Sequence, residues 1–127
     1  LTAVVGELYR IEEELRTTAA WVLGKASQNN PVVQKQILEL GVLPKLMRMV
    51  KSICSEEAVK ALYAVSAVIR NNLDGQAVFN IEGGALMLQD IMSNSSSDIR
   101  LHKKSLFLVA DLIDQAMETI SPSPPFQ

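Results

Sequence analysis

The chain has few side chains suited to acid–base or nucleophilic chemistry, and they are not grouped. Its one histidine, His102, lies among basic residues and has no cysteine or carboxylate cluster within reach by sequence. Its one cysteine, Cys54, excludes an intramolecular disulfide and a cysteine-based metal site. The sequence contains no glycine-rich phosphate loop, no nucleophile elbow and no pair of residues with metal-ligand spacing. We therefore expect neither an enzyme nor a bound cofactor.

Three aromatic residues at matching positions indicate a different chemistry, the recognition of another protein. Trp21, Tyr63 and Phe107 lie at equivalent places in three long segments with helical periodicity. Aromatic side chains are enriched among the residues that dominate protein–protein binding. The same rings could instead fill the core, so the sequence leaves an interface and a core role open.

The rings are in register because the chain repeats itself at a spacing of 42 residues. Asn29-Asn30 returns as Asn71-Asn72, and Gly41 returns as Gly83. A fixed period in this range is typical of a solenoid, in which each unit buries its apolar face against its neighbours. Because solenoids usually present a surface to a partner, the repeat favours binding over catalysis.

The composition agrees with one domain that has an aliphatic core. Of the 127 residues, 48% are hydrophobic and only 5% are aromatic. Twelve Lys and Arg against fourteen Asp and Glu give a net charge of −2. There is thus no basic excess of the kind that suggests nucleic acid, and no apolar run reaches the roughly 18–20 residues that span a bilayer. We expect no nucleic-acid partner, no membrane partner and a monomer.

Three kinds of helix recur, one short, one intermediate and one long. Asn30 is expected to cap a short helix that begins at Pro31, and Gly41 to end it in a left-handed conformation. Ser55 and Asp98 are expected to cap two of the long helices. The helices are expected over residues 1–8, 12–28, 31–40, 42–52, 55–70, 74–82, 85–92 and 98–117.

The period divides the chain into four parts. Residues 1–29 are expected to be the C-terminal part of a truncated repeat, because the offset, extended backwards, places the first residues inside a helix. Residues 30–71 and 72–117 are expected to be complete repeats. The Pro- and Ser-rich stretch 118–127 is expected to be a disordered tail. The last long helix is displaced by two residues, which the polar loop 93–97 must accommodate.

The order of short helix, glycine turn, intermediate helix and long helix, at about forty residues, resembles the armadillo repeat. Gly41-Val42-Leu43-Pro44-Lys45-Leu46 resembles that family's G-A-L-P-x-L turn, and Ala20-Trp21-Val22-Leu23 resembles its A-L-W-A-L long helix. The resemblance covers the chain to about Gln115. It implies an all-α fold, an armadillo-type right-handed superhelical solenoid of three-helix repeats, whose long helices line a concave face.

A narrower resemblance is to the armadillo nucleotide-exchange factors of the seventy-kilodalton heat-shock chaperones. It is carried by Ser27-Gln28-Asn29, Val33-Gln34-Lys35-Gln36-Ile37-Leu38, Val59-Lys60-Ala61-Leu62-Tyr63-Ala64 and Lys104-Ser105-Leu106-Phe107-Leu108. Family members grip one lobe of the chaperone's nucleotide-binding domain, so that ADP leaves. The resemblance implies this co-chaperone function and a location in the cytosol. The alternatives are a generic armadillo adaptor and the lumen of the endoplasmic reticulum.

The resemblance also implies which residues face the partner, because side chains one or two turns from each ring share its helix face. The expected partner-binding residues are Trp21, Lys25, Gln28, Tyr63, Arg70, Lys103, Phe107 and Asp111. In armadillo proteins that carry peptides, an asparagine follows the tryptophan by four residues. Here Lys25, Ala67 and Asp111 take that place, which favours a folded partner over an extended peptide.

Overall fold

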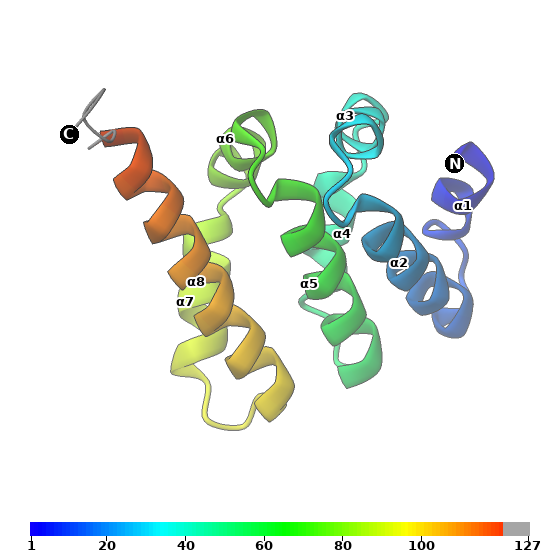
Figure 1. Cartoon of the computed structure of the whole chain (residues 1–127). Helices are drawn as coiled ribbons and strands as arrows, with labels where there is room; N and C mark the ends of the chain where they lie inside the picture. Colours follow the sequence, from blue (N-terminus) through cyan, green and yellow to red (C-terminus); the bar gives the residue numbers. More distant parts are fainter. Residues whose placement is uncertain (121–127) are drawn as a thin grey trace.

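The computed structural model describes residues 1–120, and these form a row of helices with no strand among them (Figure 1). The helices are α1 (Thr2–Glu7), α2 (Glu13–Ser27), α3 (Pro31–Glu39), α4 (Leu43–Met49), α5 (Ser55–Ile69), α6 (Leu73–Ile81), α7 (Gly84–Ser93) and α8 (Ile99–Ile120). All eight lie where the sequence predicts a helix. The predicted all-α, armadillo-type solenoid is confirmed.

The helices form two layers. The long helices α2, α5 and α8 run side by side in the front layer of Figure 1, α4 and α7 lie behind them, and the short helices α3 and α6 lie along the upper edge of the row. The N-terminus and the end of α8 lie at opposite ends of the row. The long helices therefore present one continuous face, which we call the long-helix face.

The helix α5 is the centre of the core, because it packs against α2 on one side and α8 on the other, and also contacts α3, α4 and α6. Its buried residues are Glu57, Ala58, Val59, Ala61, Leu62, Ala64, Val65, Ala67, Val68 and Ile69. Small alanines alternate with branched side chains along it, which lets neighbouring helices approach closely. Burial of this aliphatic surface is the main stabilising contribution to the fold.

The repeated asparagine pairs make the turns between long and short helices. Asn29 and Asn71 have φ angles of 50° and 52°, a left-handed conformation that asparagine tolerates better than most residues. The second asparagine of each pair caps the next helix, since Asn30 Oδ1 accepts a hydrogen bond from Val33 N at 3.2 Å. Asn72 Oδ1 accepts one from the next short helix in the same way. The predicted cap at Asn30 is confirmed.

Glutamine side chains join helices both within a repeat and between neighbouring repeats. Gln34 Nε2, on α3, donates to the carbonyl oxygens of Ala67 at 2.8 Å and Arg70 at 3.0 Å, at the end of α5. Its own Oε1 accepts from Asn72 Nδ2 at 3.3 Å. The copy of Gln34, Gln76, donates to Ile69 O at 3.0 Å and to Gln115 Oε1 on α8. These bonds satisfy helix-end carbonyls that lack a partner within their own helix.

Of the two predicted caps of long helices, one is confirmed and one is wrong. Asp98 caps α8, because its Oδ1 accepts a hydrogen bond from Arg100 N at 2.8 Å. The expectation that Ser55 caps α5 was wrong, because Ser55 is the first residue of that helix and Cys54 is its cap residue. Cys54 N donates instead to Ser52 Oγ at 3.0 Å.

The end of α8 lies beyond its predicted end. The helix continues to Ile120, three residues into the stretch predicted as a tail, and the nearest helix-breaking residue, Pro122, lies two positions further on. The rest of that tail, 121–127, lies outside the described residues. The division into repeats at 30–71 and 72–117 stays a prediction.

A buried ion pair joins α2 to α5. Arg16 Nε donates to Glu57 Oε2 at 2.7 Å, and Arg16 Nη2 donates to Glu57 Oε1 at 3.1 Å. The two side chains are only 20% and 5% exposed. Ser52 Oγ donates to Glu57 Oε1 at 2.9 Å, and Arg16 Nη1 donates to the carbonyl of Arg10 at 2.9 Å. The hydrogen bonds from Arg16 lower the pKa of Glu57 more than its burial raises it.

Replacing Glu57 by Gln should therefore destabilise the fold by about 3 kcal/mol, because it leaves a largely buried guanidinium without its charge partner. The lowered pKa of Glu57 also predicts a pH dependence. In the wild-type chain the pair stabilises the fold above the ordinary carboxyl pKa of 4.5, and this is lost as the pH falls through the lowered value. Urea unfolding of both proteins between neutral and acid pH measures the two effects.

The matched control is Glu56→Gln. Glu56 pairs with Arg100 at 2.7 Å on the surface, where such pairs contribute little. If the two variants unfold at the same urea concentration, the pair of Arg16 and Glu57 does not hold α2 to α5.

Candidate functional site

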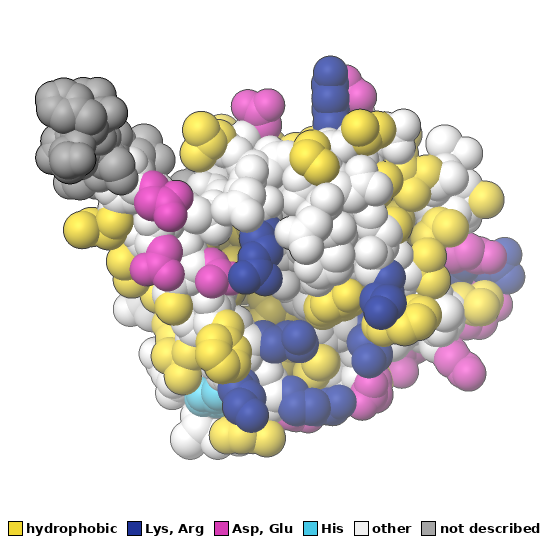
Figure 2. Space-filling model, viewed as in Figure 1, with side chains coloured by type: hydrophobic (Ala, Val, Ile, Leu, Met, Phe, Trp, Pro, Cys, Tyr) yellow, Lys and Arg dark blue, Asp and Glu magenta, His cyan; other side chains and the backbone are white. Residues whose placement is uncertain are grey.

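The aromatic rings lie on the long-helix face and are not core residues. Trp21 is 43% exposed and Phe107 is 65% exposed, whereas Tyr63, on the central helix, is half-buried. Figure 2 views this face and shows hydrophobic side chains interleaved with Lys and Arg side chains. Their exposure argues against a role as core filler for Trp21 and Phe107, and the interface role stays a prediction.

A groove of about 360 Å³ lies on this face between α5 and α8. We call it the long-helix groove. Its lining residues are Gln28, Tyr63, Ser66, Ala67, Arg70, Lys104, Phe107, Leu108 and Asp111. Five of these were predicted as partner-binding residues: Gln28, Tyr63, Arg70, Phe107 and Asp111. Of the other three predicted residues, Trp21 and Lys25 lie on α2 and Lys103 is exposed on α8, all outside the groove.

Two lysines lie over aromatic rings on this face. Lys25 Nζ is 5.7 Å from the centre of the Trp21 ring, and Lys104 Nζ is 5.0 Å from the centre of the Tyr63 ring. A cation over a ring is attracted by the ring's quadrupole, which holds both partners in place. Lys104 was not among the partner-binding residues predicted from the sequence. The signal was present, because the offset of 44 residues that aligns Phe107 with Tyr63 also aligns Lys104 with Lys60.

The charges at the groove are unevenly compensated. Arg70 Nη2 lies 3.6 Å from Asp111 Oδ2, and both side chains are well exposed, so this pair is weak. Lys104 is half-buried, and its burial, followed by repulsion from Lys60, lowers its pKa below 10.5. The groove therefore has a weak ion pair, Arg70 with Asp111, at its rim. It also has the ammonium of Lys104, which has lost part of its hydration.

Gly24 sets the position of the Tyr63 ring. A Cβ atom on Gly24 would lie 2.5 Å from Tyr63 Cε2, far below a normal contact distance, and 3.2 Å from the Cα of Ala64, which is a tight contact. Without a side chain at this point, α2 lies directly against the ring. The ring is thereby fixed between α2 and the ammonium of Lys104.

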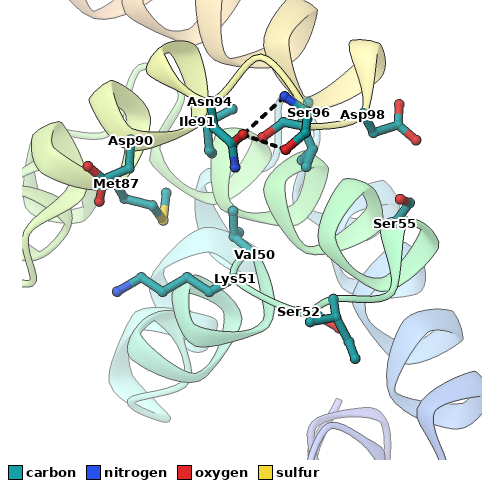
Figure 3. A pocket seen from close by; sticks show the side chains of 13 residues that line it. Val50, Lys51, Ser52, Ser55, Met87, Asp90, Ile91, Asn94, Ser96 and Asp98 are labelled. Atoms are coloured by element: carbon teal, nitrogen blue, oxygen red, sulfur yellow. Dashed lines mark hydrogen bonds between the residues drawn. The ribbon is translucent and has the colours of Figure 1, made fainter.

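A larger pocket of about 540 Å³ lies behind, where the turn between α4 and α5 faces the loop before α8 (Figure 3). Apolar side chains line it, among them Val50, Met87 and Ile91. Several of its polar groups already bond within the chain: Asn94 Oδ1 accepts hydrogen bonds from Ser96 N and Oγ, and Asp98 binds Arg100. This pocket contains none of the predicted site residues, so the long-helix groove is the better candidate.

The described residues offer no second site with catalytic or metal-binding chemistry. Within residues 1–120, no three His, Cys, Asp or Glu side chains are grouped as metal ligands. Cys54 Sγ donates to Glu13 Oε1 at 2.9 Å, and His102 Nε2 bonds to Asn94 O at 2.8 Å. Across the same residues, no helix combines the length and the apolar content needed to cross a membrane.

Gly24→Ala tests how the Tyr63 ring is held. The added methyl group must displace the ring or separate the helices, so we expect a loss of about 1–3 kcal/mol in unfolding free energy. In the double variant Gly24→Ala/Tyr63→Ala, the second substitution removes the obstacle, so the two losses should be less than additive. Thermal unfolding of both single variants and the double variant measures the coupling.

Gly6→Ala is the control, because a Cβ atom at Gly6 has no neighbour within 4 Å. This substitution should leave the stability unchanged or raise it slightly, as alanine favours a helix over glycine. Additive losses in the double variant would show that Gly24 does not position the ring.

Comparison with known proteins agrees with the fold. The model of the family described as the SIL1/FES1/HPBP1 C-terminal domain matches residues 1–123. An engineered protein of known crystal structure superposes with a TM-score of 0.80 at 21% identity, over 93% of this chain and 48% of that one. At that identity, the likeness concerns the fold alone.

Curated relatives share more of the sequence. The chain is 29% identical over 121 residues to the Hsp70 nucleotide exchange factor FES1 of Mycosarcoma maydis, covering 95% of this chain and 31% of that protein. It is 35% identical over 100 residues to human Hsp70-binding protein 1, covering 78% of this chain and 27% of that protein. The chain thus spans about a third of the length of these relatives. The family match over nearly its whole length shows that the chain belongs to the SIL1/FES1/HPBP1 C-terminal domain family.

Proposed function

We propose that the chain binds the nucleotide-binding domain of a seventy-kilodalton heat-shock chaperone through its long-helix face and promotes the release of ADP. The observation that carries the proposal is the exposure of Trp21 and Phe107 on one face, on either side of the groove beside Tyr63. The names of the relatives support the same partner, since they include an Hsp70 nucleotide exchange factor and an Hsp70-binding protein.

Exchange of this kind requires binding and no bond-making chemistry. The long-helix face would bind the open, nucleotide-free conformation of the chaperone domain more tightly than the closed one, which shifts the population toward release of ADP. By thermodynamic linkage, bound nucleotide would weaken the complex by the same factor. We accordingly propose a co-chaperone that is not itself an enzyme and uses no cofactor.

We place the protein in the cytosol, with the lumen of the endoplasmic reticulum as the alternative. The supporting observation is Cys54, an unpaired thiol, which favours a reducing compartment. We also propose that the chain acts as a monomer. Fractionation of the source cells, followed by detection of the protein, distinguishes the two compartments.

The function is tested by the release of a fluorescent ADP analogue from the chaperone's nucleotide-binding domain after mixing with the chain. We expect the release rate to rise with the concentration of the chain and to reach a plateau when the complex is saturated. A sedimentation measurement on the same mixture reports complex formation independently. If release is not accelerated and no complex forms, the proposal is wrong.

A complex without accelerated release would favour the second candidate function, an armadillo adaptor. In that case the chain binds the chaperone but does not discriminate between its open and closed conformations. The affinity measured with and without ADP separates the two functions. An adaptor shows equal affinities, whereas an exchange factor binds more weakly when ADP is present.

Trp21→Ala and Phe107→Ala test the face. Each should weaken binding to the chaperone domain by about 2 kcal/mol, or roughly 30-fold, because exposed rings of this kind are typical anchors of an interface. Phe107→Ala should change the unfolding free energy by about 0.5 kcal/mol or less, since the ring is mostly exposed. Titration calorimetry and urea unfolding on each variant give both quantities.

Leu86→Ala is the matched control, because Leu86 is 66% exposed on α7, in the layer behind the long helices. It removes a similar apolar side chain from the other layer and should leave binding unchanged. Equal weakening by Leu86→Ala and Phe107→Ala would mean that the long-helix face is not the binding surface.

A further inference from the structure

The long-helix face is basic although the chain as a whole is slightly acidic. Lys25 and Lys104 lie over rings on this face, Lys60 lies close enough to Lys104 to repel it, and Arg70 lines the groove. The chain carries a net charge of −2. Figure 2 shows Lys and Arg side chains across the middle of this face and most Asp and Glu side chains toward its edges. Positive charge is thus gathered beside the rings, with Asp111 as the carboxylate that lines the groove.

Lys104 has the most unusual environment of these cations. It is half-buried between α5 and α8, over the Tyr63 ring, and no carboxylate within residues 1–120 forms an ion pair with it. Burial and the neighbouring Lys60 both act against its charge, as the lowered pKa of Lys104 indicates. A cation that has lost water and gained no counter-ion costs stability in the free chain.

The groove beside Lys104 has the size and the lining to admit a side chain from a partner. Its volume is about 360 Å³, and Ala67 and Leu108 line it with apolar surface. Polar groups at its edge can donate hydrogen bonds: the ammonium of Lys104, the guanidinium of Arg70 and the amide of Gln28. The Ser66 hydroxyl is already used, because it donates to Tyr63 O at 2.8 Å.

We propose that the long-helix groove receives an acidic side chain, Asp or Glu, from an acidic patch on the chaperone's nucleotide-binding domain, with Lys104 as its counter-ion. This inference rests on the proposed function and adds the chemical nature of the surface that is bound. An incoming carboxylate replaces the hydration that Lys104 has lost. Its negative charge also offsets the repulsion between Lys60 and Lys104. Arg70, whose contact with Asp111 is long, is free to turn toward the same carboxylate.

A polyanion such as nucleic acid fits the groove less well than a single carboxylate. Asp111 lines the groove, and Asp114 follows one turn later on the exposed side of α8. A continuous phosphate backbone would meet these carboxylates along with the lysines. A protein surface with a localised acidic patch can place its carboxylate next to Lys104 and avoid Asp111.

Lys104→Gln separates this role from a structural one. The substitution removes the charge and keeps a long polar side chain. We expect the affinity for the chaperone domain to fall about tenfold at low salt, roughly 50 mM, and by much less at about 300 mM, because salt screens the lost attraction. The melting temperature should stay the same or rise, since the uncompensated charge is gone. A residue that served only the fold would show the opposite pattern.

Two matched variants complete the design. Lys35→Gln removes an exposed lysine from α3, at the upper edge of the row and outside the long helices, and should leave both the affinity and its salt dependence unchanged. Lys104→Arg keeps the positive charge and should retain the affinity to within about threefold, whereas Lys104→Glu should weaken binding more than Lys104→Gln does.

The outcomes distinguish this inference from the proposed function. If the wild-type chain does not bind the chaperone domain, the proposed function fails and this inference fails with it. If the wild-type chain binds, but Lys104→Gln and Lys35→Gln bind equally well and with the same salt dependence, the acidic partner surface is refuted while the function stands. Loss of affinity in Lys104→Gln alone, restored in Lys104→Arg, supports the inference.

Discussion

The structure depends on one constraint: each long helix can bury its apolar side only against helices of the neighbouring units. The constraint is fully met at α5, which has a long helix on each side and is buried along most of its length. It is met on one side only at α8, where Leu106, Ile113 and Met117 are exposed. Among the described helices, α5 should therefore be the one that opens least readily.

Burial alone does not fix how one unit is rotated against the next, because apolar contact is not directional. Polar contacts provide that direction. Gln34 binds the last carbonyls of α5, and the pair of Arg16 and Glu57 joins the beginnings of α2 and α5. Arg16 and Glu57 thus tie α2 to α5 near their beginnings, and Gln34 ties α3, which follows α2, to the end of α5. The shared face of α2 and α5 is rigid enough to hold Trp21 and Tyr63 in register, with Gly24 keeping the second ring against α2.

The features that the sequence predicted well depend on single residues or on the period. A positive φ angle at a turn residue and the capping of a helix each depend on residues within one turn. The cap at Asn30 and the left-handed turn at Gly41 could therefore be predicted directly from the sequence. The period placed the helices and brought five of the eight predicted residues to one groove. Contacts between units could not be read in this way. Glu57 and Lys104 find their partners 41 residues away along the chain, on another helix, where only the packing decides which side chains meet.

The two asparagines in the left-handed conformation have a geometrical consequence. Asn29 and Asn71 have nearly the same φ angle, so the chain reverses in the same way after α2 and after α5. Similar reversals contribute to a similar rotation and rise of successive units, and these two quantities define the curvature of a solenoid. Two residues that do not line the groove therefore help to set the curvature of the face on which the rings lie, and hence the convexity of a partner that can touch all of them at once.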